Sequence, residues 1–292
     1  MPAPDSVRRP SSQPTAASFA GWLLLLVAIV AASAWWWWKE RRAFAPESVQ
    51  ATAAAPADQP PAAEPALHHP IEDIAPPQQP LPPLAEADGE VRQALDGLLG
   101  ARQVATFLEP EGFVRRTVAT VDNLTREHVA ARLWPVQPAP GRFAVQGPAD
   151  AQTQTIAPDN ATRYRAFVAF AEGVPLDAAV GLYARLYPWF QTAYEELGYP
   201  GRYFNDRLVA VLDHLLATPE PAGPLAVQLT AVAGQVPSTR PWVRYEFADP
   251  ALQRLSSGQK MLLRMGPENA RRLKAVLAGV RQRVATGIRP PA

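Results

Sequence analysis

The composition of this 292-residue chain limits its class before any motif is considered. A formal net charge of +1 argues against a nucleic-acid binder that works through overall charge. The absence of cysteine excludes disulfides, thiolate metal sites and a cysteine nucleophile. The 33 prolines exceed the usual background of about 5% and are unevenly spread, which indicates a boundary between an extended segment and a folded one.

An uncharged apolar stretch at residues 19–38 follows an N-terminal tail at residues 1–18. A helix of about 20 residues crosses a hydrocarbon core of roughly 30 Å, so we expect a transmembrane helix here. Trp22 stands near one end and four tryptophans at 35–38 stand at the other, where indole rings prefer the headgroup zone. A cleaved signal peptide would instead carry a small-residue cleavage site at this place. We therefore expect an uncleaved anchor that contacts membrane lipid through residues 19–38.

The charges that flank this span leave its orientation open. Arg8 and Arg9 precede it, whereas Lys39, Arg41 and Arg42 follow it, so the positive-inside rule leans toward a cytoplasmic C-terminal side. A short leader, a hydrophobic span and a long remainder are the usual layout of a bacterial signal anchor that exports its domain. We favour export, which predicts a single-pass inner-membrane protein with a periplasmic globular domain.

Residues 39–84 are predicted to form a proline-rich linker. Prolines recur from Pro46 to Pro83 with alanines between them, and such a segment lacks the amide donors and the apolar area of a folded core. In polyproline II conformation, its main part would reach on the order of 120 Å. His68 and His69 lie in this stalk, and we interpret them as incidental and not as a metal site.

Residues 85–288 regain helical periodicity, which predicts one globular domain with a substantial core. The expected fold class is mainly α (α+β), a helical domain with a small β-strand pair, plus the N-terminal transmembrane helix. Helices are expected at residues 90–99, 111–121, 158–172, 175–197 and 203–217, and further helices are expected to begin at Pro250, Ser256 and Gly266. The expected strand pair is 227–231 with 243–247, and 142–146 is a candidate short strand.

Local signals mark several helix ends. Pro175 suits an opening turn, Gly198 ends the same helix, and Pro188 inside it should produce a kink. Ser256 with Gln259 matches a capping box.

The sequence contains no signature of a phosphate loop, a zinc site, an EF-hand or a nucleophile elbow. We therefore predict no catalytic residue, no metal ligand and no cofactor. Asp213 and His214 are adjacent and would point about 100° apart on a helix, so they do not form a relay. Asp206 and Asp213 share a helical face, and with Glu195 they are the carboxylates that a hydrolase would use.

Aromatic side chains are concentrated between residues 183 and 204. Half of them fall on the core stripe of the predicted helix, where plain packing is the simplest interpretation. Trp189 falls off this stripe, and with Tyr199, Tyr203 and nearby arginines it suggests a groove for a peptide or a sugar. The candidate binding residues are Arg163, Trp189, Tyr199, Tyr203, Asp206 and Arg207.

The last predicted helix carries five basic residues, which are Arg271, Arg272, Lys274, Arg281 and Arg283. Such a face can meet anionic lipid or nucleic acid. The near-neutral charge of the domain favours an ordinary solvated face instead, and we predict no nucleic-acid partner.

Several runs of residues resemble the bacterial family called domain of unknown function 3014. They include Arg-Tyr-Arg-Ala-Phe-Val at 163–168, Tyr-Glu-Glu-Leu-Gly-Tyr at 194–199, Phe-Asn-Asp-Arg at 204–207, Tyr-Glu-Phe-Ala-Asp-Pro at 245–250 and Ser-Gly-Gln-Lys at 257–260. The resemblance covers most of residues 85–285 and implies a membrane span, a proline-rich spacer and this domain. Asn-Leu-Thr at 123–125 departs from the expected Asn-Leu-Pro. The family implies no activity, cofactor or catalytic residue.

Together these observations predict a membrane-anchored cell-envelope protein of unknown activity, in which a non-enzymatic binding or scaffold module is presented on a proline-rich stalk. An envelope protein or peptidoglycan is the expected partner. The alternative is an envelope hydrolase that acts on peptidoglycan or glycan through carboxylates of the helical domain. Two carboxylates in a deep cleft would favour the hydrolase, and a shallow aromatic groove would favour the binder.

Overall fold

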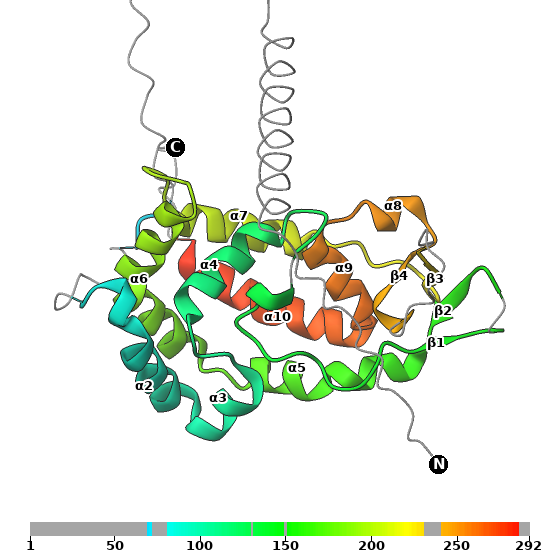
Figure 1. Ribbon diagram of the computed structural model, residues 1–292, viewed down its shortest axis with the longest axis horizontal. Coiled ribbons are helices and arrows are strands. Elements are labelled where there is room, and N and C mark those ends of the chain that lie inside the picture. The colour runs from blue at the N-terminus through cyan, green and yellow to red at the C-terminus, as the bar shows by residue number, and fades with distance from the viewer. Residues whose placement is uncertain (1–68, 72–80, 130, 149–150, 231–240, 286–292) are drawn as a thin grey trace, which may run out of the picture. The chain divides into compact units, whose positions relative to one another are not determined.

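The computed structural model describes residues 69–71, 81–129, 131–148, 151–230 and 241–285 (Figure 1). The predicted tail, the predicted membrane span and most of the predicted linker lie outside these ranges. The described part is mainly helical with a small antiparallel sheet, which confirms the fold class at that level.

Nine α-helices are found among the described residues. They are α2 (Ala87–Leu99), α3 (Ala101–Phe107), α4 (Phe113–Asn123), α5 (Arg165–Glu172), α6 (Leu176–Glu196), α7 (Phe204–Leu216), α8 (Pro250–Gln253), α9 (Ser257–Arg264) and α10 (Pro267–Val284). Short 3₁₀ helices are η2 (Leu84–Glu86), η3 (Ala131–Leu133), η4 (Pro158–Tyr164) and η5 (Pro241–Val243). All the predicted helical segments are present, and α3 was not predicted.

The predicted pairing of residues 227–231 with 243–247 is confirmed, and the sheet has two further strands. The four strands are β1 (Val145–Gln146), β2 (Gln154–Ile156), β3 (Ala226–Leu229) and β4 (Tyr245–Phe247), paired antiparallel in the order β1-β2-β3-β4. The strand β1 lies inside the candidate strand 142–146. The strand β2 was not predicted, because its three residues are too few to show an alternating pattern.

Four clusters of buried apolar side chains form the core. The largest joins α2, α3, α4 and α6 and includes Phe204 at the start of α7. Two smaller clusters lie between α7 and the C-terminal helices α9 and α10, and the fourth joins the sheet to α9. Helix α10, the last of the described helices, packs against α7, α5, α6 and α9 (Figure 1).

The capping box and the internal proline that the sequence predicted are both found in helices. Ser256 and Gln259 form a complete capping box at the start of α9. Pro188 lies inside α6, which continues through it from Leu176 to Glu196. Gly258 allows α9 to approach its neighbours closely, because a Cβ at this position would come within 2.5 Å of the side chain of Leu215.

Within the described ranges, no single helix has both the length and the apolar character needed to cross a bilayer. The segments Pro158–Glu172 and Leu176–Glu196 meet that test only when taken together, across a bend of 77°.

Candidate functional site

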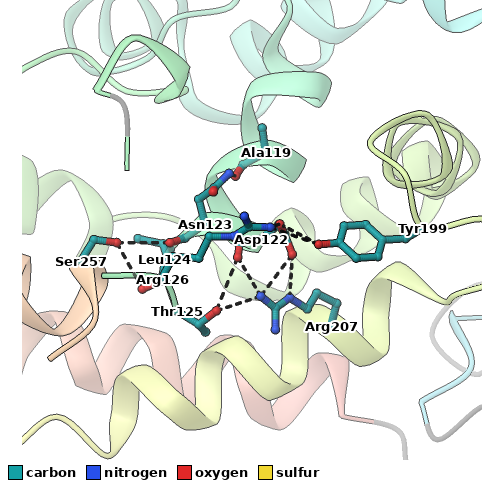
Figure 2. A network of polar contacts seen from close by, with 9 residues as sticks. All are labelled: Ala119, Asp122, Asn123, Leu124, Thr125, Arg126, Tyr199, Arg207 and Ser257. Atoms are coloured by element: carbon teal, nitrogen blue, oxygen red, sulfur yellow. Dashed lines mark hydrogen bonds and ion pairs between the residues drawn. The ribbon is translucent and has the colours of Figure 1, made fainter. Parts of the chain in front are cut away.

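The first of two polar centres surrounds Asp122, at the C-terminal end of α4 (Figure 2). Its side chain is only 4% exposed. One carboxylate oxygen accepts a hydrogen bond from Arg207 Nε of α7 at 3.2 Å. The other accepts from Arg126 Nη2 at 2.8 Å and from the Tyr199 hydroxyl at 3.2 Å. The buried negative charge is thus compensated by two guanidinium groups and one phenol.

The backbone after Asp122 belongs to the same centre. Arg207 Nη2 also donates to the Asp122 carbonyl at 2.7 Å and to Thr125 Oγ1 at 2.8 Å. Thr125 stands where the family resemblance led us to expect proline, and its hydroxyl supplies an acceptor that proline lacks. The amides of Ser257 and Gly258 donate to the carbonyls of residues 126 and 124, so the start of α9 is fastened to the same loop.

Electrostatics in this centre follow from the short contacts. The bond to the Asp122 carboxylate and its negative charge raise the pKa of Arg126. The Arg126 side chain is 56% exposed, whereas that of Arg207 is 27% exposed. The centre joins α4, the loop after α6, α7 and α9, and its donors and acceptors are engaged with one another. This arrangement is suited to holding helices together.

The second polar centre is Asn205, in the first turn of α7, whose side chain is fully buried. Its amide nitrogen donates to the carbonyls of Val284 and His69, each at 2.9 Å. Its side-chain oxygen accepts from the Tyr183 hydroxyl at 3.2 Å, and its backbone N–H donates to the Tyr187 hydroxyl at 3.1 Å. A single neutral side chain therefore ties α6, the end of α10 and a residue of the predicted stalk to α7.

Residues 69–71 and 82, which fall in the predicted linker, are bonded to the helical domain. The His69 N–H donates to Asp206 Oδ1 at 2.8 Å, and the Ile71 N–H donates to the Tyr203 hydroxyl at 2.7 Å. The Ile71 side chain is 5% exposed and belongs to the largest core cluster. Farther along, the Pro82 carbonyl accepts a hydrogen bond from the indole of Trp189 at 2.7 Å.

The structure distributes the six candidate binding residues among four places. Tyr199 and Arg207 lie at the Asp122 centre, and Tyr203 and Asp206 hold residues 69–71.

The other two candidates make separate contacts. Trp189 is 3% exposed and lies beneath Pro82. Arg163 lies in η4, where it donates to the Pro140 carbonyl at 2.8 Å and to Asn160 Oδ1 at 2.9 Å. Because Trp189 is covered by the chain itself, the aromatic region presents packed rings and not an open groove at that residue.

The rings of this region pack at the distances typical of a protein core. Tyr194 stacks on Tyr199 with centroids 4.7 Å apart, and Tyr183 meets Phe190 edge-on at 5.2 Å. Burial raises the pKa of the Tyr183, Tyr187 and Tyr194 hydroxyls above their ordinary value. These tyrosines therefore remain neutral at physiological pH.

The three carboxylates considered for a hydrolase make three different contacts. Asp213 forms two hydrogen bonds with Arg281, at 2.7 and 3.1 Å. Asp206 accepts from the stalk, and Glu195 accepts from Gln191 Nε2 at 2.8 Å. The Asp213 contact joins α7 to α10 and the Asp206 contact joins α7 to residue 69, whereas the Glu195 contact lies within α6.

A serine–histidine contact was not anticipated from the sequence. His214 Nε2 lies 2.8 Å from Ser256 Oγ, while the neighbouring Asp213 points to α10. A pair of this kind can activate a serine nucleophile. Here Ser256 is only 6% exposed and its hydroxyl also accepts the amide of Gln259 as the cap of α9, so helix capping accounts for its position.

The basic face of α10 is largely neutralised by acidic residues. Four of its five basic side chains form ion pairs, which are Arg272 with Glu172, Lys274 with Glu220, Arg281 with Asp213, and Arg283 with Asp177. The partners come from α5, α6, α7 and the segment after α7. This pattern agrees with an ordinary solvated face.

Across the described ranges, no group of three or more His, Asp or Glu side chains is placed to hold a metal ion. An open hollow of about 480 Å³ lies at the β1–β2 hairpin, lined by Gln146, Gly147, Thr153, Gln154 and Thr155. Its lining residues include no acid or base.

The fold and its polar centres define a mainly helical domain whose buried polar groups connect its helices. The chain matches the family described as protein of unknown function (DUF3014) over residues 113–281, which is more than half of its length, and it belongs to that family. Comparisons with curated proteins and with solved structures gave no significant match. Several of the runs that carry the resemblance converge on the two polar centres, since they contain Tyr199, Asn205, Arg207 and Ser257.

Proposed function

We propose that this protein is a single-pass, membrane-anchored protein of the cell envelope, and that its helical domain is a non-enzymatic binding or scaffold module presented on a proline-rich stalk. The proposed location is the inner membrane, with the domain in the periplasm. The proposed partner is an envelope protein or peptidoglycan.

The observation that carries the non-enzymatic part is the commitment of the acidic groups to structural contacts. Asp122 is enclosed by two guanidinium groups, Asp213 is paired with Arg281, and Asp206 receives the His69 amide. A general acid or base needs access to a substrate proton within hydrogen-bond reach. These carboxylates instead contact groups of the chain itself, which favours a scaffold over a hydrolase.

The contacts of the stalk support the presentation role. The hydrogen bonds of residues 69–71 and of Pro82 fasten the end of the proline-rich segment to α6 and α7. These bonds would hold the domain at the end of the stalk in a defined orientation. The apolar stretch at residues 19–38 is long enough for a helix to cross a bilayer, which supports the anchor.

A topology reporter fused after Ile288 tests the location. We expect activity of a reporter that functions only in the periplasm, and we expect the intact chain in the membrane fraction. A soluble, full-length chain would refute the anchor, and a reporter active only in the cytoplasm would refute export.

Turnover and binding assays with peptidoglycan test the activity of the full chain purified in mild detergent. We expect co-sedimentation with peptidoglycan sacculi or with an envelope protein bound to them, and no release of fragments. Release of fragments that Asp213→Asn abolishes, while the exposed-residue control Asp159→Asn retains it, would establish the hydrolase and refute the scaffold.

A further inference from the structure

The start of α7 recognises the main chain of a short peptide segment. The two N–H groups of residues 69–71 are both bonded, to Asp206 and to Tyr203, and Pro70 has no N–H to satisfy. The His69 carbonyl accepts from Asn205. Three side chains at the start of α7 thus bind main-chain atoms, which every peptide carries. They are Tyr203, Asn205 and Asp206.

The side chains of the segment add selectivity. Ile71 is 5% exposed and packs into the cluster of buried aromatic and aliphatic side chains. A charged side chain at this position would lose its hydration without gaining a partner. Proline in the middle suits the contact, because an ordinary residue would bring a further N–H that needs an acceptor.

We propose that the N-terminal turn of α7 is a peptide-binding site for segments of the form Xaa-Pro-Ile, and that residues 69–71 of the stalk are its intramolecular ligand. This site is defined by contacts within the domain, so the proposal goes beyond the proposed function and does not depend on the membrane anchor or on the compartment.

Burial of the recognising groups explains why the site needs an occupant. Asn205 is fully buried, and departure of the segment would leave one of its amide hydrogens without an acceptor. It would also leave a cavity in place of Ile71. Both effects are unfavourable, and a second peptide with the same main-chain and side-chain groups would relieve them.

The segment 69–71 is far in sequence from the residues that bind it, so it can be treated as a tethered ligand. His69 and Asp206 are 137 positions apart, and Ile71 and Tyr203 are 132 apart. A tethered ligand acts at an effective concentration on the order of millimolar, so a free peptide competes with the wild-type stalk only at that concentration or above.

A binding titration tests the proposal with the full chain in mild detergent. The probe is a fluorescent peptide with the sequence of residues 67–73, Leu-His-His-Pro-Ile-Glu-Asp. The variant Ile71→Asp empties the site and should bind the probe at least about tenfold more tightly than the wild type, whose site is occupied. Adding Asp206→Ala and Tyr203→Phe to Ile71→Asp should weaken binding by about threefold to tenfold per lost hydrogen bond.

The matched control is the same peptide with aspartate in place of isoleucine, which should not bind the Ile71→Asp chain. Equal binding of both peptides, or equal binding by the wild type and Ile71→Asp, would overturn the proposal. So would a folded Ile71→Asp chain, judged by circular dichroism, that binds neither peptide.

Thiol labelling tests the proposal if the Ile71→Asp chain does not fold. The chain has no cysteine, so Ile71→Cys provides a single thiol in the site and Ala85→Cys provides a single exposed thiol as control. We expect maleimide to label position 71 at least about tenfold more slowly than position 85, and excess probe peptide to accelerate only the former. Equal labelling rates, or no effect of the peptide at several millimolar, would refute the site.

Discussion

The Asp122 and Asn205 centres perform the same task with different chemistry. Both connect α7 to neighbouring helices through side-chain hydrogen bonds. The Asp122 centre is charged, and its partner Arg126 is 56% exposed, so water reaches part of it. The Asn205 centre is neutral and the Asn205 side chain itself is fully buried, and its partners are two tyrosines and two backbone carbonyls.

The difference follows from the cost of burying charge. Full burial of an ion pair requires desolvation of both groups, and their attraction often fails to compensate for it. An amide such as Asn205 has two donors and an acceptor that can all be satisfied without charge. The domain accordingly uses a charged junction near its surface and a neutral one inside, and the two should respond differently to mutation, salt and pH.

Asn205→Ala should have the largest effect. It leaves the Val284 and His69 carbonyls and the Tyr183 hydroxyl without this partner in a buried place, at an expected cost of about 3 to 4 kcal/mol in the free energy of unfolding. Denaturant unfolding of the full chain measures it. The control Asn123→Ala removes one bond to the Ala119 carbonyl within α4 and should cost less than about 1 kcal/mol. Equal losses in the free energy of unfolding for the two variants would show that Asn205 does not hold α7 to its neighbours.

Asp122→Asn should rank second, because it preserves the shape of the side chain and removes its charge. Two charge-assisted hydrogen bonds to Arg207 and Arg126 weaken, and we expect a loss of about 2 kcal/mol. Unfolding at low and high salt measures both the cost and its screening. Asp159→Asn, an exposed carboxylate in η4, is the control and should change the stability by less than about 0.5 kcal/mol. A loss as small as in the control would show that the charge of Asp122 contributes nothing to the junction.

Alkaline pH should weaken the Asn205 centre through its tyrosines. Burial and the neighbouring Tyr183 raise the pKa of Tyr187 in the folded chain above its ordinary value of 10.0. The unfolded chain therefore releases this proton first, so the stability is complete below about pH 10 and falls as the pH rises further.

Tyr187→Phe removes that titration and should reduce the loss of stability above about pH 10, at a cost of about 1 kcal/mol at neutral pH. Tyr183→Phe should act in the same direction, since burial also raises the pKa of Tyr183. Unfolding curves at several alkaline pH values, followed by phenolate absorbance, measure the effect. An unchanged pH dependence in both variants would contradict the role of these hydroxyls.

Arg126→Ala should have the smallest effect, because its exposed guanidinium gains little from an ion pair in water. We expect a loss of about 0.5 kcal/mol that decreases with added salt. Arg207→Lys should cost more, about 1 kcal/mol, since a lysine cannot maintain bonds to Asp122 and Thr125 in the same geometry. A larger loss for Arg126→Ala than for Arg207→Lys would show that the exposure of each arginine does not determine how much it stabilises the Asp122 centre.

The sequence predicted much of the fold, because helical periodicity and capping residues are local. The capping box of Ser256 and Gln259 and the helices from α4 to α10 were expected from spacing alone. Helix α3 was missed, since its seven residues contain one fully buried apolar side chain, Val104, and show no stripe. Val227 and Leu229 stand two positions apart in the expected strand 227–231, yet Val227 is fully buried and Leu229, the last residue of β3, is 46% exposed.

The sequence selected candidate residues for the site, but it did not predict which of them lie together in space. Tyr203 and Asp206 were selected for a groove, and they hold residues 69–71. Trp189 fell off the predicted core stripe, yet it is buried beneath Pro82. Asp122 and Asn205 were not selected at all, because nothing in a single sequence distinguishes a buried acid or amide from an exposed one.

By itself, the sequence determined the helices other than α3, the absence of thiol chemistry and the family, because each depends on residue type and short-range spacing. Tertiary structure alone decided which polar groups meet, since Asp122 lies 85 positions from Arg207 and His69 lies 136 from Asn205. Contacts over such separations depend on how helices pack around a shared core. The same packing places residues 69–71 against the start of α7.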